Sequence, residues 1–557
     1  MTRSLNLDDI QGNVIRAYGR YSFPFARYFF LNIADCGKGR QFIQAVRQKV
    51  TTGAVWPEGG KPLVTLNIGF TFLGMLKLQI PERTLRGMPE DFISGMRNRA
   101  FILGDRDVTK TEAESVGWDK HWDPIWQGNR KGDGDDTDNV HIWISMNAQL
   151  KTPGQDEPVD ELEQQTQWLR DLCQELDQGV RILTTNGKNG DQEYQASSAV
   201  FEEKNGIKLP TPKEHFGFSD GIGDPVYKGQ YPPEIEKQNV IGRGKRMTPE
   251  AGWEPIEAGE FILGQPDESQ ELPPAAAPPE FTRNSTFMAY RKLHENVGTF
   301  EEVMREEAKS YAAVQGVSEV EARETLHAKM CGRWSDGVPT SVVPTYEEWI
   351  AFGDKMGFND PDPVKSLENQ VAYLRSPAAS NFVYADDMLG YKNPVGSHLR
   401  RMNTRDYLDP LNKVGIDPET GEQFKNESAT SALNKRRRIL RRGLPYGPRV
   451  GEEKNDETEQ GVTMIIMCAS LSRQFEFVQQ QWIQYGLDFH QGNDTCPMLG
   501  NHDRHKRFTI TADPKSGKQP YVMSKLKTFV ECRGGDYFFI PSMTGLRMMA
   551  MGIVDAT

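Results

Sequence analysis

The stretch YFFLNIADCGKGRQFIQAVRQKV, residues 28–50, joins two patterns of different period. Its first part, YFFLNIAD at 28–35, is a short run of apolar and aromatic residues that is typical of a buried strand. From residue 39 onward the apolar side chains return at helical spacing, as Phe42, Ile43 and Val46 show. The stretch therefore predicts a β-strand followed by a helix with one apolar face.

The same rhythm recurs along the chain. Further strands are expected at residues 63–70, 141–148, 286–293, 462–469 and 537–543. Further helices are expected at residues 159–176, from near Thr299, and through residues 475–483. Two halves with antiparallel strands and helices on one face predict the α+β class and a pair of ferredoxin-like units. Two such sheets facing each other would form a dimeric α+β barrel-like sandwich, with room for a ligand between sheet and helices.

Composition excludes some classes of function. The 557 residues carry a formal net charge of -12, which argues against a sequence-independent grip on nucleic acid, because phosphate neutralisation needs clustered Lys and Arg. The six cysteines form no CxxC pair, so neither a zinc site nor a disulfide framework is indicated and a reducing compartment fits best. No export signal or apolar span of membrane length is present, and we expect a cytoplasmic protein that does not bind membranes.

An acidic loop at residues 132–139 and two segments of the second half read as insertions into this architecture. Residues near 265–281 are too rich in proline for the interior of an element, and residues near 410–432 are polar and irregular. We expect a first half at 1–225 and a second half at 226–557 that carries the latter two insertions. The basic run KRRRILRR, at 435–442, is expected to begin as a solvated face.

The segment EHFGFSDGIGDP, residues 214–225, places one carboxylate, Asp220, in a frame of glycines. Glycine lets the backbone approach a flat or bulky group without a Cβ in the way. Taken alone, Asp220 could equally be a turn residue that caps a helix. Its function therefore depends on the other residues that accompany it.

Most of the nine histidines have no spacing that suggests a metal site. His398 differs, because a proline and a glycine precede it and basic residues follow in NPVGSHLRRMNTRD, 393–406. A helix start with a solvated basic face is the simpler interpretation for a lone histidine. A second segment, ILRRGLPYGP at 439–448, adds arginines beside glycine and aromatic residues.

A carboxylate among glycines, one histidine and an arginine pair together resemble the dye-decolorizing peroxidases. Gly217 to Gly221 match the GxxDG pattern of that family, and the other matches follow in family order over most of the chain. They are LDDIQGNVI (7–15), residues 66–105 as a first long helical segment, AKMCGRWSDGVP (328–339), residues 382–406 and residues 439–448. The length and the insertions resemble the larger, cytoplasmic branch of the family.

The resemblance assigns roles to individual residues. Asp220 would be the distal acid, Arg441 the distal arginine and His398 the proximal ligand of a b-type haem iron, one haem per chain. Residues implied to contact the haem are Gly221, Ile222, Gly223, Asn403, Thr404 and Arg405. Asp494, in GNDTCPMLG, would be the carboxylate that hydrogen-bonds the proximal imidazole. Val462 and Met464 would occupy distal pocket positions that the family often fills with Leu and Phe, and Asn393 stands where the family often has Cys.

The implied activity is that of a peroxidase. Hydrogen peroxide would be reduced while bulky donors such as dyes and phenols are oxidised through a high-valent iron-oxo intermediate. A haem carrier or iron-release protein, and an idle scaffold, are the alternatives from other classes. Because storage needs only the ligand His398, the presence of Asp220 and Arg441 favours the peroxidase. The sequence leaves open the physiological donor and self-association into a homo-oligomer.

Overall fold

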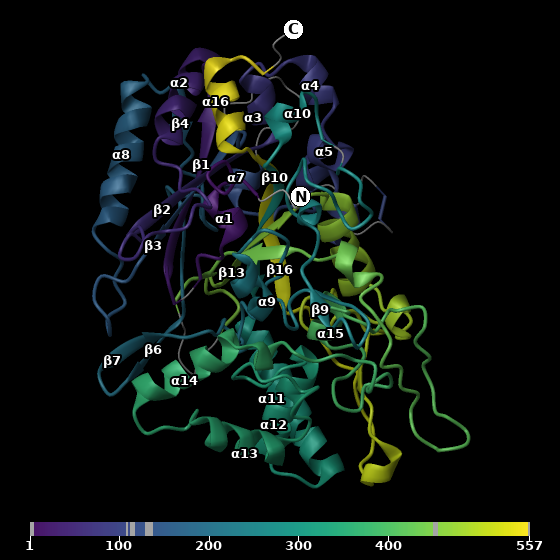
Figure 1. Ribbon diagram of the computed structural model, residues 1–557. Coiled ribbons are helices and arrows are strands. Elements are labelled where there is room, and N and C mark those ends of the chain that lie inside the picture. The colour runs from purple at the N-terminus through teal and green to yellow at the C-terminus, as the bar shows by residue number, and fades with distance from the viewer. Residues whose placement is uncertain are drawn as a thin grey trace.

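The structure is a computed structural model that describes residues 5–19, 21–106, 110–111, 117–127, 138–273, 275–448 and 455–554. Its central feature is a 10-stranded sheet with the strand order β11-β13-β10-β16-β2-β3-β1-β4, in which β5 also pairs with β1 and β12 with β13. Helices surround this sheet on its outer side (Figure 1). The predicted α+β class is confirmed.

The four strands β2-β3-β1-β4 at one end of the sheet form one unit. They are β1 (Phe25–Ile33), β2 (Val64–Phe70), β3 (Ile142–Ala148) and β4 (Val180–Ile182), and they are antiparallel in the order β2-β3-β1-β4. Helix α2 (Cys36–Arg47) follows β1, and α8 (Glu161–Glu175) follows β3. This order is that of a ferredoxin-like unit, as the sequence predicted.

The second unit repeats the order with β11-β13-β10-β16. Its strands are β10 (Thr286–Glu295), β11 (Leu440–Arg442), β13 (Gly461–Cys468) and β16 (Val530–Ile540). Helix α11 (Val297–Gln315) follows β10, and the π-helical segments η4 (Leu471–Glu476) and η5 (Val478–Ile483) follow β13. The strands β4 and β11 have three residues each and were not predicted, because so short a run shows no periodicity.

The two units share one curved sheet. They join where Phe539 of β16 pairs with Phe70 of β2. A second link between the units joins β5 (Gln195–Ser198), which pairs with β1, to β13. It is a hydrogen bond of 2.9 Å between the hydroxyl oxygens of Ser197 and Thr463. Inside the curve, the rings of Tyr28 and Tyr290 lie 6.0 Å apart. The sheet is thus barrel-like, and aromatic side chains from both units fill its interior.

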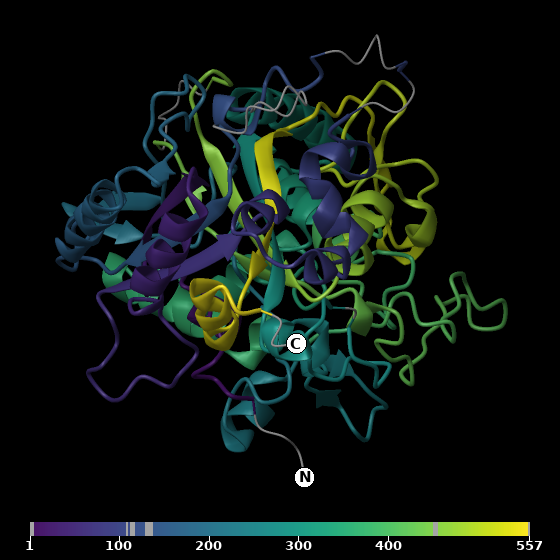
Figure 2. The ribbon, with the colours of Figure 1, turned by 90° about the horizontal axis from the view of Figure 1, so that it is seen from above.

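Helices of the second unit form the lower end of the molecule in Figure 1. They are α11, α12 (Glu319–Cys331), α13 (Tyr346–Met356) and α14 (Pro363–Arg375). Residues 410–432 extend from this region as an irregular loop, seen in green at the right of Figure 2. Residues 265–281 are also irregular until α10 (Pro279–Thr282) begins, with residue 274 outside the described part.

The predicted long helical segment at 66–105 is wrong. After β2 the chain forms α3 (Phe72–Lys77), α4 (Glu82–Arg86), α5 (Glu90–Asn98) and α6 (Ala100–Leu103). Pro81 and Pro89 stand at the N-caps of α4 and α5. Because proline removes a backbone donor and clashes with the preceding turn, it starts helices here and cannot continue them.

The remaining elements are short. They are α1 (Gly12–Ile15), α7 (Pro124–Gln127), β6 (Phe201–Lys204), β7 (Ile207–Pro210), α9 (Pro233–Asn239), β8 (Lys245–Arg246), β9 (Trp253–Glu254), α15 (His398–Met402), β12 (Pro445–Tyr446), β14 (Phe508–Ile510), β15 (Tyr521–Met523) and α16 (Met543–Met551), with 3-10 turns η1 (Ala258–Glu260), η2 (Pro377–Ala379), η3 (Asn434–Arg436), η6 (Leu487–Phe489) and η7 (Pro514–Ser516). No helix in the described ranges is both long enough and apolar enough to cross a membrane.

Candidate functional site

The loop at 214–225 is closed by its own first side chain. The carboxylate of Glu214 accepts hydrogen bonds from the backbone N–H of Phe216 at 2.9 Å and of Phe218 at 2.7 Å. The backbone N–H of Asp220 donates to Pro212 O at 2.8 Å. Gly221 and Gly223 have φ values of 78° and 80°, in the left-handed region that favours glycine. The Asp220 carboxylate is therefore held on a tight turn, as its glycine frame suggested.

Strand β11 brings two arginines to this loop. The guanidinium of Arg441 forms a bidentate ion pair with Asp220, in which Nη2 donates to Oδ2 at 2.7 Å. Its neighbour Arg442 pairs with both oxygens of Asp224 at 3.0 Å. Burial opposes the charge on Arg441, but the Asp220 carboxylate outweighs it and raises the pKa of the guanidinium. The loop and the strand thus meet through two parallel ion pairs, one of which contains both predicted catalytic residues.

His398 begins the short helix α15. The hydroxyl of Ser397 caps this helix by accepting the N–H of Arg400 at 3.4 Å, and it donates to Asn393 Oδ1 at 2.5 Å. Asn393 in turn donates to Gly332 O and to the hydroxyl of Ser341. The N-cap and the preceding loop therefore fix the position at which His398 leaves the backbone.

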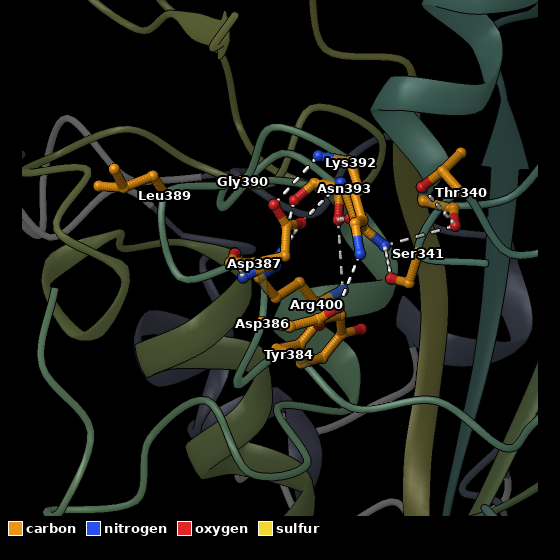
Figure 3. A network of polar contacts seen from close by, with 12 residues as sticks. Thr340, Ser341, Tyr384, Asp386, Asp387, Leu389, Gly390, Lys392, Asn393 and Arg400 are labelled. Carbon is orange, nitrogen blue, oxygen red and sulfur yellow. Dashed lines mark hydrogen bonds and ion pairs between the residues drawn. The ribbon is translucent and has the colours of Figure 1, made fainter. Parts of the chain in front are cut away.

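A buried carboxylate, Asp387, organises the same loop (Figure 3). It accepts the N–H of Lys392 at 3.0 Å and of Asn393 at 2.9 Å, and it pairs with the guanidinium of Arg400 at 2.7 Å. The side chains of Asp387 and Arg400 are 1% and 0% exposed. Arg400 also lies over the ring of Tyr384, 4.2 Å from its centroid. The Asp387–Arg400 pair under His398 is therefore closed to water and hydrogen-bonded through both Nη atoms of Arg400, whereas Arg400 Nε has no partner within the described ranges.

The imidazole of His398 contacts sulfur. Its Nδ1 lies 3.3 Å from Sγ of Cys496, whose side chain is buried. Burial lowers the pKa of His398 to about 4, with the nearby Arg441 cation acting in the same direction. The ring is therefore neutral near pH 7, which is the state that binds a metal. Because Nδ1 is engaged, Nε2 is the nitrogen left for a ligand.

The contact predicted for Asp494 is wrong. Its Oδ1 accepts the backbone N–H of Arg507 at 2.9 Å, while its backbone carbonyl accepts from Arg401 at 3.1 Å. The residue that reaches His398 is two positions further on, at Cys496. In an irregular segment no period sets which side chain turns inward, so the sequence could not distinguish the two.

Asp220, Arg441 and His398 line a single cavity of about 290 Å³. The cavity has two sides. The Asp220 wall is the loop 219–225 with Arg441 and Arg442, and the His398 wall is residues 398–405. Apolar side chains on and beside these walls are also part of the lining; they are Ile222, Leu399, Met402, Ile439 and Leu444. The thiol-bearing Cys331 also lines the cavity.

Three cations in the lining, Arg333, Arg405 and Arg438, form no ion pair within the described ranges, and Arg333 donates to Gly337 O and Ala379 O at 2.8 Å. Arg405 is 2% and Arg438 6% exposed. Arg405 donates to Phe382 O at 2.9 Å, and Arg438 makes only long contacts with Gly244 O and Gly223 O. Burial lowers the pKa of Arg405 to about 10 and of Arg438 to about 9. Desolvated guanidinium groups of this kind require an anion.

These residues fit the haem that the resemblance implies. A neutral imidazole with a free Nε2 suits iron, and the unpaired guanidinium groups of the lining suit the two haem carboxylates. The apolar lining suits a flat macrocycle. The donor set, the unpaired cations and the glycine turn thus agree on one kind of ligand.

Other predicted contacts divide into two groups. Gly221, Ile222, Gly223, Asn403 and Arg405 line the cavity, whereas Thr404 is buried outside its lining.

The distal positions proposed for Val462 and Met464 are wrong. Val462 pairs with Pro445 and Leu293 in the sheet, and Met464 lines a separate cavity with Arg291. Strand β11 lies at the edge of the sheet beyond β13, so it is β11 that faces the cavity.

Sequence reasoning missed the acids behind Asp220. Glu214 and the buried Glu295 of β10 are hydrogen-bonded to each other. Burial raises the pKa of Glu214 to about 7, with the charge of Asp220 acting in the same direction. Burial and the adjacent Glu214 raise the pKa of Glu295 well above its usual range. The pair therefore retains a proton near neutral pH.

The expected solvated face at KRRR is also wrong. Lys435 pairs with Glu268 at 3.3 Å and Arg436 with Asp267 at 2.9 Å, while Arg437 lies over the ring of Phe477. Arg438 reaches the cavity. Each cation of this run contacts an acidic or aromatic side chain or lines the cavity, and composition alone does not reveal these contacts.

Comparison with known proteins covers nearly the whole chain. No family model matches the sequence. The chain is 22% identical to the dye-decolorizing peroxidase msp1 of Mycetinis scorodonius and 25% identical to a dye-decolorizing peroxidase of Exidia glandulosa, over 98% of this chain and 87% of each relative. A solved dye-decolorizing peroxidase in complex with 2,6-dimethoxyphenol superimposes with a TM-score of 0.66 at 20% identity, over 98% of this chain and 100% of that one.

Proposed function

Because the chain belongs to the dye-decolorizing peroxidase family, we propose that it is a haem peroxidase that reduces hydrogen peroxide and oxidises dyes and phenols. The observation that carries this proposal is the single cavity on which Asp220, Arg441 and His398 converge. Haem bound there would supply the electron-transfer chemistry with peroxide and donor. The protein supplies its binding, its orientation and its electrostatic surroundings.

We propose that this cavity binds one b-type haem per chain. His398 would ligate the iron through Nε2, and Arg405 and Arg438 would pair with the two haem carboxylates. Gly221 and Gly223, with Ile222 between them, would pack on the ring. The sequence contains no CxxCH motif for covalent attachment.

Asp220 and Arg441 divide the work on peroxide. The Asp220 carboxylate takes the proton from one peroxide oxygen and returns it to the leaving oxygen, as a positioned base and then acid. Arg441 stabilises the negative charge that develops on the leaving oxygen. Their bidentate pairing keeps the proton acceptor and the cation side by side, so both reach the same peroxide molecule.

A haem carrier without turnover is the competing function. It needs His398 and the unpaired arginines but has no use for a charged pair on the opposite wall. Purified holoprotein mixed with hydrogen peroxide in a stopped-flow instrument, with the Soret band followed, separates the two. We expect a rapid spectral change that phenols such as 2,6-dimethoxyphenol reverse, and an unchanged spectrum would leave only the carrier.

The ligand assignment has its own test. His398→Ala should lose the Soret band or retain haem far more weakly. Its matched control is His490→Ala, at an exposed position outside the cavity lining. A normal haem complement in His398→Ala would contradict the assignment.

The six cysteines are free thiols, which fits a reducing compartment and supports a cytoplasmic location. The length and the loop at 410–432 favour the larger branch of the family. Fractionation of cells that produce the protein would test its location, and recovery outside the cytoplasm would contradict it.

A further inference from the structure

The second nitrogen of His398 has an unusual partner. A histidine that ligates a metal usually donates its other N–H to a carboxylate, a backbone carbonyl or water, and that partner sets the orientation of the ring and its basicity. In this protein the group at Nδ1 is Sγ of Cys496, at 3.3 Å. A thiol is a weak acceptor and a weak donor, so this contact orients the ring without the charge of a carboxylate.

The position of Cys496 is fixed from both sides. Its N–H donates to Ile483 O at 2.7 Å, and its carbonyl accepts the N–H of Gly500 at 2.9 Å. Arg401, on the same short helix as His398, donates to the carbonyls of Trp482, Tyr485 and Asp494. The segment that carries the thiol is thus bound to the helix that carries the imidazole, so the contact is built into the fold.

The charged groups that act on His398 are the cations Arg441 and Arg401 and the carboxylate of Asp220. Arg401 is 1% exposed, and its guanidinium donates to backbone carbonyls and lies over the ring of Phe489. The carboxylate of Asp494 is turned to the backbone of Arg507. Within the described ranges, the hydrogen-bond partner of His398 Nδ1 is the sulfur of Cys496.

We propose that Cys496 is the positioning residue of His398 and that it holds the imidazole in place while leaving it less basic than a carboxylate partner would. This inference rests on the proposed function, since it concerns the iron that His398 would ligate. A less basic imidazole stabilises ferric iron less, so the ferric/ferrous potential is higher than it would be with a carboxylate at residue 496. The thiol is thus a device that sets the potential.

Three substitutions at one position test this. Cys496→Asp introduces the carboxylate and should lower the ferric/ferrous potential and raise the Fe–His stretching frequency of the ferrous protein. A change of about tenfold in the relative affinity for the two oxidation states is about 59 mV for a one-electron couple. Cys496→Ser keeps a neutral partner and should stay near the parent potential. Cys496→Ala leaves Nδ1 without its partner, and its Fe–His band should broaden as the ring gains freedom.

The matched control is Asp494→Asn, two residues away, which should leave the potential and the Fe–His band unchanged. The inference is overturned if Cys496→Asp and Cys496→Ala both keep the parent potential and Fe–His band, or if Asp494→Asn shifts them instead. Should Cys496→Asp fail to bind haem, the Fe–His band of Cys496→Ala alone decides the outcome. A parent protein that binds no haem through His398 would instead sink the proposed function, which separates the two failures.

Discussion

The two walls of the cavity are held in opposite ways. On the Asp220 wall the reactive groups pair with each other, and their side chains remain 17% and 36% exposed for Asp220 and Arg441. On the His398 wall the reactive ring is neutral, and the charges that support it, Asp387 and Arg400, are 1% and 0% exposed. The Asp220 wall thus presents its catalytic charges to the cavity, whereas the charged pair that supports His398 is buried behind the ring.

This difference matches the work of each wall. A group that exchanges protons with peroxide needs access to water and an adjacent counter-charge. A metal ligand needs a fixed orientation, which a closed and hydrogen-bonded network supplies. Substitutions that disrupt the His398 wall should therefore lower stability and haem retention. Substitutions on the Asp220 wall should instead lower the rate of the reaction with peroxide.

The largest effect is expected under His398. Asp387→Asn leaves the Arg400 guanidinium buried without its counter-charge, and breaking a buried pair in this way costs about 3–5 kcal/mol. Urea unfolding should show this loss, together with weaker haem retention. The adjacent Asp386→Asn is the control, because the Asp386–Lys392 pair is 49% and 38% exposed. Exposed pairs contribute about 0–1 kcal/mol, so equal losses for the two variants would contradict the comparison.

The next effect is on rate. Asp220→Asn and Arg441→Leu should each slow the reaction with peroxide by about 10²–10³-fold while haem stays bound, because each removes one catalytic group from the Asp220 wall. Stopped-flow absorbance at the Soret band measures the rate. Asp224→Asn is the control on the parallel pair with Arg442, whose guanidinium is 5% exposed and binds Asn13 O and Val14 O. Its cost should fall on stability, and a rate loss as large as that of Asp220→Asn would show that the loop, and not the acid, matters.

The sequence predicts the walls unequally. Periodicity and turn residues are local signals, so the strand and helix at 28–50 and the glycine turn around Asp220 were predicted correctly. The partner of His398 and the burial of Arg438 are tertiary facts. Cys496 and Asp494 differ by two positions in an irregular segment, and only the packing of that segment on α15 decides which one faces the ring.

The smallest effect should come from the acid pair behind the Asp220 wall, and its sign follows from the pKa. Glu214 contacts Glu295 and lies near Asp220 and Arg441, and its pKa is raised from 4.5 to about 7 in the folded chain. The folded state therefore binds its proton more tightly than the unfolded state, so stability is lost as pH rises from about 4.5 to about 7.

The variant Glu214→Gln tests this, because its side chain is neutral at every pH and it also removes the repulsion that raises the pKa of Glu295. The difference in urea midpoint, variant minus parent, should thus grow between about pH 5 and about pH 8, and contributions from the buried histidines cancel in that difference. Glu203→Gln, on the exposed strand β6, should give a difference that does not change with pH. A constant difference for Glu214→Gln as well would mean that the pair holds no proton, so that Glu214, Glu295 and Asp220 would all be ionised near Arg441.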